Sequence, residues 1–156
     1  GDVEKLGALR TALQKANDAY WTGQLDIQMR IASAWIALAE GRQAQALTML
    51  REAADAEDLT DKSAISPGPI KPARELLGEM LLEVKRPADA LREFEATMAK
   101  EPNRFRGVYG AAIAAAGAGN REKARSYSAQ LLEICQRADK PGRPELQEAE
   151  RRSRAQ

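Results

Sequence analysis

The chain has 156 residues, of which 24 are basic and 23 acidic, so its net charge of +1 provides no overall attraction to nucleic acid or to an anionic membrane. Hydrophobic residues make up 44% but aromatic residues only 4%, and strand formers are sparse, which predicts an all-α fold closed by small side chains. With no histidine, one cysteine and no Gly-rich loop between a strand and a helix, the sequence lacks the usual parts of a catalytic or phosphate-binding site. We therefore predict a protein that is not an enzyme and holds no cofactor and no metal.

The compartment is only loosely constrained by the sequence. No apolar stretch approaches the roughly 20 residues of a membrane span, and the N-terminus lacks a signal-peptide pattern. Cys135 cannot form an internal disulfide, and beside two leucines it is more typical of a small packed residue than of a nucleophile. We expect a soluble protein without membrane insertion, cytoplasmic or, if a signal sequence has been removed, exported. Because Gly1-Asp2 leads at once into a helix pattern, we also expect a fragment of a longer protein.

Three helices are predicted before residue 59. Apolar residues at three- and four-residue spacings predict a helix over 3–21, ended by Thr22-Gly23, and a second over about 24–40. Gly41 suits the left-handed conformation that closes a helix, and a third helix follows to about residue 58. Residues 59–70, LTDKSAISPGPI, are predicted to be an inserted connection, which either covers a binding groove or acts as a spacer.

The stretch 72–104 predicts two amphipathic helices. Lys85-Arg86-Pro87 makes the turn between them, with Pro87 at the first helical position, where its missing N–H has no helical acceptor to lose. Small, apolar and proline residues lie at characteristic positions of the pair: Leu77, Gly78, Leu81, Ala90, Phe94 and Pro102. With these residues the pair resembles the tetratricopeptide repeat, a unit of about 34 residues and two antiparallel helices.

Small and turn-forming residues recur at two offsets that extend this resemblance. Forty-four residues separate Ala34 from Gly78, Gly41 from Lys85 and Ala46 from Ala90, and thirty-four separate Gly78 from Ala112, Lys85 from Gly119 and Ala90 from Ala124. The resemblance implies a right-handed superhelical array of antiparallel helix pairs, a tetratricopeptide-like α-solenoid of about seven to eight helices. The chain would then be a single domain, 1–156, with three repeats at 27–58, 71–104 and 105–138. The remaining segments would be the 3–21 helix of a truncated preceding repeat, the 59–70 insertion and a polar capping helix at 143–154.

The resemblance also implies a function, the binding of a peptide or protein segment on a concave face lined by the first helix of each pair. The predicted partner-binding residues are Ile31, Trp35, Leu38, Glu75, Glu79, Arg104, Arg106, Tyr109 and Ile113. Two structural alternatives stay open: Trp35 packs in the core against Tyr20 or Trp21, and the two arginines only pair with the two glutamates.

A second function class is a structural spacer or a homo-oligomer that forms through exposed repeat ends. Nucleic-acid binding by the basic residues after 150 is disfavoured, because glutamates interrupt them and no aromatic residue lies between them.

Overall fold

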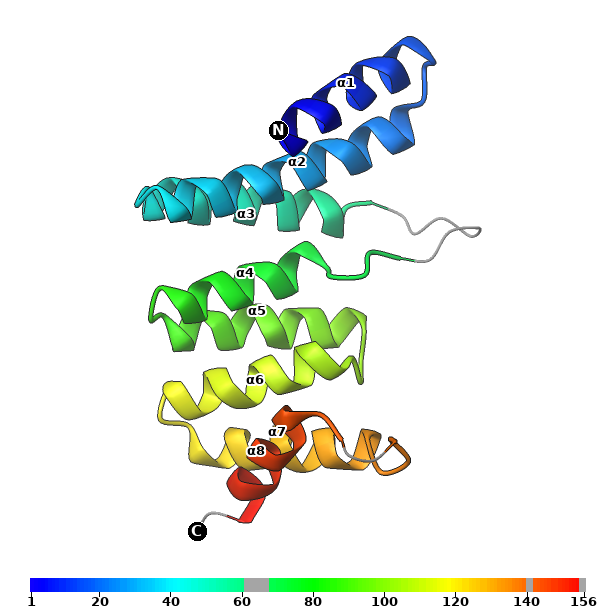
Figure 1. The fold of residues 1–156 in the computed structure, drawn as a ribbon. Coiled ribbons are helices and arrows are strands. Elements are labelled where there is room, and N and C mark those ends of the chain that lie inside the picture. The colour runs from blue at the N-terminus through cyan, green and yellow to red at the C-terminus, as the bar shows by residue number, and fades with distance from the viewer. Residues whose placement is uncertain (61–67, 140–141, 155–156) are drawn as a thin grey trace. The chain divides into compact units, whose positions relative to one another are not determined.

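The computed structural model describes residues 1–60, 68–139 and 142–154, in which the chain forms eight α-helices and no strand (Figure 1). The all-α prediction is confirmed. The helices are α1 (Asp2–Lys15), α2 (Ala19–Ala39), α3 (Gln43–Asp58), α4 (Ala73–Glu83), α5 (Pro87–Lys100), α6 (Phe105–Gly117), α7 (Arg121–Ile134) and α8 (Pro144–Arg154). None of these described helices combines the length and the hydropathy that a membrane span requires.

The chain divides into two compact units, Gly1–Leu77 and Gly78–Gln156, with the boundary inside α4. In the first unit α1 packs against α2, and α2 against α3. The residues that α2 and α3 bury are Ile27, Ile31, Ala34, Ala37, Ala46, Leu47, Leu50, Ala53 and Ala54. Because most of them are alanine, the two helices can approach closely, as the composition predicts. The division into repeats within one domain stays a prediction.

The first predicted helix, 3–21, is wrong at its end. α1 stops at Lys15, and α2 begins at Ala19 and runs through Thr22-Gly23. The break falls at Asn17, which has a left-handed φ of 57°, and at Asp18, whose carboxylate accepts a hydrogen bond from the Trp21 amide at 3.0 Å. An N-cap of this kind satisfies an amide that has no helical acceptor, and it therefore fixes the start of α2.

The turns after α2, α4 and α6 share one backbone motif. Each contains a left-handed residue, Gly41 at φ 79°, Lys85 at φ 60° and Gly119 at φ 78°. The next amide donates to the carbonyl oxygen five residues earlier: Arg42 to Ala37 at 2.8 Å, Arg86 to Leu81 at 2.8 Å, and Asn120 to Ala115 at 2.9 Å. This pattern is the Schellman ending, which satisfies carbonyl groups at a helix C-terminus. The three turns predicted at these positions are confirmed.

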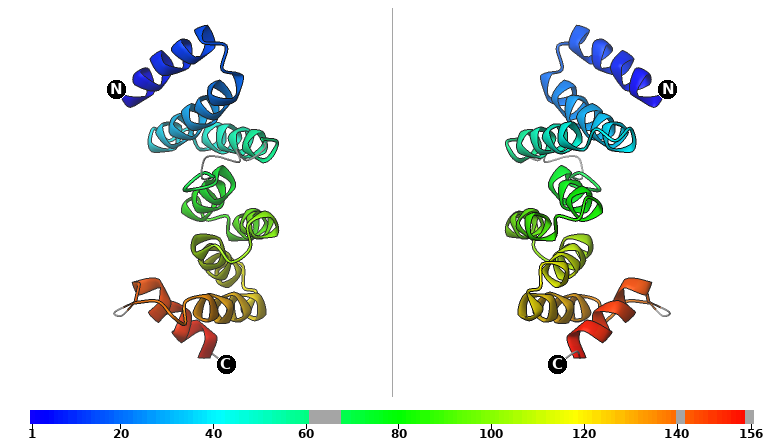
Figure 2. Two further views of the ribbon diagram at one scale, coloured as in Figure 1. Left: turned by 90° about the vertical axis from the view of Figure 1, so that its right-hand side faces the viewer. Right: turned by 90° about the vertical axis from the view of Figure 1, so that its left-hand side faces the viewer.

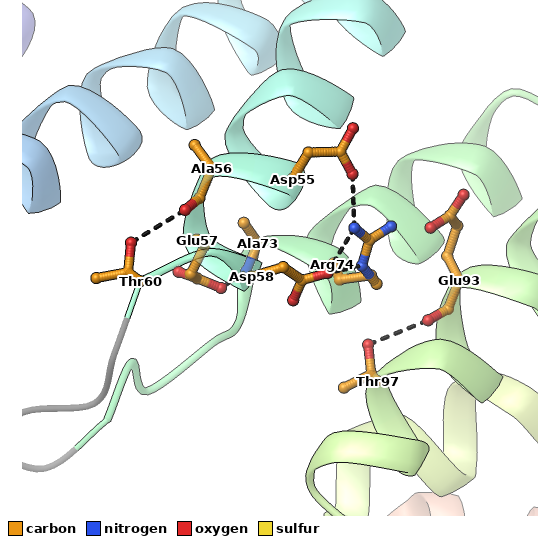
Figure 3. Close-up of polar contacts among 9 residues, drawn as sticks. All are labelled: Asp55, Ala56, Glu57, Asp58, Thr60, Ala73, Arg74, Glu93 and Thr97. Atoms are coloured by element: carbon orange, nitrogen blue, oxygen red, sulfur yellow. Dashed lines mark hydrogen bonds and ion pairs between the residues drawn. The ribbon is translucent and has the colours of Figure 1, made fainter.

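Side chains of α3 and the first turn of α4 close the base of the predicted 59–70 insertion (Figure 3). Glu57 Oε2 accepts a hydrogen bond from the Ala73 amide at 2.6 Å. Arg74 Nη2 lies 2.6 Å from a carboxylate oxygen of Asp55 and 2.6 Å from one of Asp58, and the Arg74 side chain is only 15% exposed. Residues 61–67 lie outside the described residues, so the covering role of the insertion stays a prediction.

In the second unit, α5 packs on α6, α6 on α7, and α7 on α8 (Figure 2). The apolar cluster of the last three helices is centred on Val108, Leu131 and Ala149. Ser128 is fully buried beside this cluster in α7, and its hydroxyl donates to the Ala124 carbonyl at 2.7 Å. The hydroxyl is therefore satisfied within its own helix, which lets a small polar residue occupy a packed position.

Phe94 is the largest fully buried side chain in the described part of the chain, with 1% of its surface exposed. A Cβ atom added to Gly110 would lie 2.4 Å from Cε1 and Cζ of the Phe94 ring, and one added to Gly78 would lie 2.8 Å from Cε2 and Cζ. Both distances are well below van der Waals contact. The two glycines, one on α4 and one on α6, therefore leave the space that the ring fills.

A polar link joins α5 to α7. Glu95 accepts hydrogen bonds from Lys123 Nζ at 2.6 Å and from the Tyr127 hydroxyl at 2.7 Å. Burial, and after it the hydrogen bond to Glu95, raises the pKa of Tyr127 to about 12. Burial of Glu95 acts to raise its pKa, but the hydrogen bonds from Lys123 and Tyr127 outweigh burial and lower it.

Candidate functional site

The candidate site is a groove of about 260 Å³ in the second unit. Its walls come from the last turn of α4, from Phe94 of α5, from one face of α6 and from the start of α8. Positions three and four residues apart on a helix share one side, which explains why residues 106, 109, 110 and 113 all reach the groove. The lining residues used below are Glu79, Leu82, Glu83, Phe105, Arg106, Tyr109, Ile113 and Glu145.

Aromatic rings form one wall of the groove. Phe105 and Tyr109 are stacked with their centroids 6.2 Å apart and their planes at 21°. The Arg143 guanidinium carbon lies 4.9 Å from the Phe105 ring centroid, within the range of a cation–π contact. The rings are thus held in place from the side of α8.

Tyr109 is fixed at its hydroxyl as well as at its ring. The hydroxyl donates to Glu148 Oε2 at 2.6 Å, which links α6 to α8. Burial, and after it this hydrogen bond, raises the pKa of Tyr109 to about 12. The hydrogen bond from Tyr109, with the nearby Arg152, in turn lowers the pKa of Glu148. The phenol is therefore neutral at physiological pH and offers an apolar face to the groove.

Acidic side chains outnumber basic ones on the groove lining. Glu79, Glu83 and Glu145 are present with one arginine, Arg106. Arg106 Nε lies 3.5 Å from Glu79 Oε1, and the two side chains are 47% and 30% exposed, so the pair is weak and easily exchanged for another partner. The groove thus joins an apolar, aromatic wall to a negatively charged rim.

The structure brings together four of the nine predicted partner-binding residues. These four are Glu79, Arg106, Tyr109 and Ile113. Glu75 is fully buried and Ile31 is only 7% exposed, so the expectation that both project from an open face is wrong, because their side chains belong to the packed interior. Arg104 is half-buried, lies outside the groove lining, and pairs with Glu101 at 3.1 Å.

The other two predicted residues, Trp35 and Leu38, are half-buried on α2 in the first unit. Tyr20 and Trp21 contact each other edge to face, with centroids 5.2 Å apart. Among the described residues neither ring contacts that of Trp35, so the proposed packing of Trp35 against these rings is absent.

Glu83, Phe105 and Glu145 are among the lining residues that sequence reasoning missed. Glu83 lies four residues after Glu79 on the same helix face, and this spacing is the sequence signal that could have identified it. Phe105 is the first residue of α6 and was not among the predicted partner-binding residues. Glu145 belongs to the helix predicted as a cap, and no feature of the sequence predicts that its start returns to the groove.

No protein-family model matches the sequence, and no curated protein is significantly similar to it. In the part of the chain that the structure describes, no group of three or more acidic, cysteine or histidine residues could hold a metal ion. The groove lining itself offers aromatic surface, aliphatic surface and carboxylates.

Proposed function

We propose that the chain is a tetratricopeptide-like array of helix pairs in a right-handed superhelix, and that it serves as a non-catalytic module that binds a segment of a partner protein. Support for the repeat comes from the turns at Gly41, Lys85 and Gly119, which use one hydrogen-bond pattern at spacings of 44 and 34 residues. The sequential packing of neighbouring helices within each unit supports it too.

The groove of the second unit carries the functional part of the proposal. Leu82, Tyr109 and Ile113 offer apolar contact beside the carboxylates of Glu83 and Glu145. Apolar and aromatic anchors supply most of the free energy of a peptide interface, and complementary rim charges select the partner. The preferred ligand is therefore a peptide segment with an aliphatic or aromatic side chain next to a lysine or arginine.

Selection from a phage-displayed library of random peptides on the full chain tests this proposal. We expect enrichment of a basic residue within a few positions of Leu, Phe or Tyr. For a selected peptide, Ile113→Ala should weaken binding about fivefold to tenfold, as expected for an apolar anchor. Glu83→Gln should weaken it about threefold, and salt should remove most of that effect, because exposed charges are screened beyond about 10 Å at 0.1 M salt.

Matched controls lie on α7, outside the groove. Ile134→Ala removes the same atoms as Ile113→Ala, at a position that is 36% exposed, and Glu133→Gln removes one exposed carboxylate. Both variants should bind like the parent chain. Selected peptides without a preference for basic residues, or equal losses in the α7 controls, would show that the groove is not the binding surface.

The first unit favours self-association as a second candidate function. α1 buries none of its residues, and Leu9, Trp21 and Ile36 are 50%, 46% and 46% exposed. Large apolar side chains exposed on neighbouring helices mark a surface that another copy of the chain can cover. Such a contact would bury the aromatic pair of Tyr20 and Trp21.

Sedimentation equilibrium over a range of protein concentrations tests self-association. We expect a dimer that the double variant Leu9→Glu and Trp21→Glu converts to a monomer, because a carboxylate buried at the contact loses its hydration. Leu59→Glu, at a position that is 88% exposed, is the control and should leave the dimer unchanged. A parent chain that is monomeric at every concentration would exclude this function.

A further inference from the structure

A second cavity in the second unit differs from the groove in both place and charge. Its volume is about 850 Å³, and its lining comes from the end of α6, residues 121–129 of α7 and the last turn of α8. Alanines at positions 116, 124 and 129 provide apolar surface, and three arginines, Arg121, Arg125 and Arg152, line it against a single acidic residue, Glu122. The cavity shares no residue with the groove.

Two of these arginines have no ion-pair partner among the described residues. Arg121 and Arg125 are exposed and make no salt bridge with any residue that the structure describes, whereas Arg10, Arg30 and Arg86, for example, each pair with a carboxylate. Paired arginines elsewhere in the chain thus contribute little net charge to the surface. The positive charge around the cavity is not compensated in this way.

The third arginine has an unsatisfied nitrogen. Arg152 Nη2 pairs with a carboxylate oxygen of Glu148, but its Nη1 is buried and has no hydrogen-bond acceptor. A buried charged donor without an acceptor is unfavourable, and a rotation of the Arg152 side chain toward a ligand oxygen in the cavity would relieve that cost. This observation is independent of the surface charge and points to an oxygen-bearing anion.

The spacing of the arginines fits an extended acidic peptide. Arg121 and Arg125 are four residues apart on α7, which separates them by about 6 Å along the helix axis. Alternate side chains of an extended peptide repeat at about 6.6 Å and point the same way. Two acidic residues separated by one residue therefore match the two guanidinium groups.

We propose that this cavity binds an acidic, extended segment of a partner protein. Its carboxylates pair with Arg121, Arg125 and Arg152, and its small side chains lie on the alanine surface. The volume is larger than one small oxyanion needs, and an isolated ion would make no favourable contact with the apolar surface. A peptide is therefore favoured over free phosphate. This site is independent of the groove and prefers a ligand of the opposite charge.

Fluorescence anisotropy of the full chain with a labelled ten-residue peptide of alternating Glu and Ala tests the proposal. The matched peptide of alternating Gln and Ala should not bind. Arg121→Gln and Arg125→Gln should each weaken binding of the Glu peptide about threefold to tenfold, because a charge-assisted pair is lost. Glu122→Gln should tighten binding, a gain that a purely structural role would not produce.

Charge-matched controls separate this site from the groove and from general attraction. Arg137→Gln removes one exposed arginine beyond the other end of α7, and Glu83→Gln changes the groove; neither should change binding of the Glu peptide. Far-UV circular dichroism should be the same for all variants. Equal weakening by Arg137→Gln, equal binding of the Gln peptide, or binding of inorganic phosphate without the Glu peptide would each overturn the proposal.

Discussion

The fit of Phe94 between two glycines makes a specific prediction about stability: Gly110→Ala should destabilise the protein although alanine is the better helix former. Gly110 lies inside α6 and has no positive φ, so its backbone suits any residue. The nearest obstacle is the Phe94 ring, 2.4 Å from the position of the new Cβ. Gly23, inside α2, has nothing within 4 Å of its Cβ position and provides the control.

The expected magnitude is the difference between two opposing effects. Alanine in place of glycine in a helix interior contributes about 0.8 to 1 kcal/mol. Adding a methyl group to a filled site costs about 1 to 3 kcal/mol, and at Gly110 we expect the upper end because the ring that must move is fully buried. Gly110→Ala should therefore lower the free energy of unfolding by about 1 to 2 kcal/mol, whereas Gly23→Ala should raise it by about 0.5 to 1 kcal/mol.

Urea unfolding followed by two signals measures these changes. Both tryptophans, Trp21 and Trp35, belong to the first unit, so their fluorescence reports on residues 1–77, while far-UV circular dichroism reports on all helices. Gly110→Ala should shift the circular dichroism transition to lower urea. A fluorescence transition that moves with it would show that the two units unfold together.

A double-mutant cycle assigns the loss to the ring. Phe94→Leu alone should destabilise, but in the Gly110→Ala background it should cost less, with a coupling of at least about 0.5 kcal/mol. If Gly110→Ala is as stable as the parent chain or more so, or if the two changes are additive, the reasoning from the close approach is wrong.

Three further predictions follow from the polar contacts. Tyr127→Phe should lower the free energy of unfolding, measured by urea titration at pH 7, by about 0.5 to 1.5 kcal/mol. Its acceptor Glu95 has a pKa that folding lowers, so the Glu95 carboxylate stabilises the fold above its ordinary pKa of 4.5. This stabilisation should disappear as the pH falls through the lowered pKa. Tyr109 and Tyr127 should ionise near pH 12 in an absorbance titration at alkaline pH, and because folding raises both pKa values from 10.0, their stabilising contribution should be full below pH 10 and lost as the pH rises through 12. Arg74→Met should lower the free energy of unfolding by about 1 to 3 kcal/mol in thermal or urea unfolding, because the carboxylates of Asp55 and Asp58 lose a mostly buried guanidinium partner. Arg30→Met removes an exposed pair and should lower it by less than about 1 kcal/mol.

The turns were predictable from the sequence because their causes are local. Gly41 and Gly119 adopt the left-handed conformation that few other residues accept, and Pro87 occupies the first position of α5 as expected. The break before α2 was misplaced for the same local reason. Asn17 provides the turn and Asp18 the N-cap, and together they end one helix and start the next more effectively than Gly23, which α2 accommodates.

The groove was only partly predictable, because it depends on which helices meet. The sequence places Glu75 and Glu79 on one helix face, but burial changes within a single turn: Glu75 is fully buried and Glu79 lines the groove. Glu145 reaches the groove, and Arg152 the basic cavity, through the packing of α8 on α7. A polar helix with few apolar residues carries little information about where it docks.

The closed base of the predicted 59–70 insertion has a practical consequence for protein engineering. Glu57 caps α4 and Arg74 bridges two carboxylates of α3, so the two chain ends at this point are held by groups outside the insertion itself. Doubling the length of a closed loop costs only about 0.6 kcal/mol in chain entropy. A reporter domain whose own termini lie close together can therefore be fused between Thr60 and Gly68. The existing contacts of Glu57 and Arg74, and not the added sequence, would hold the end of α3 against the start of α4.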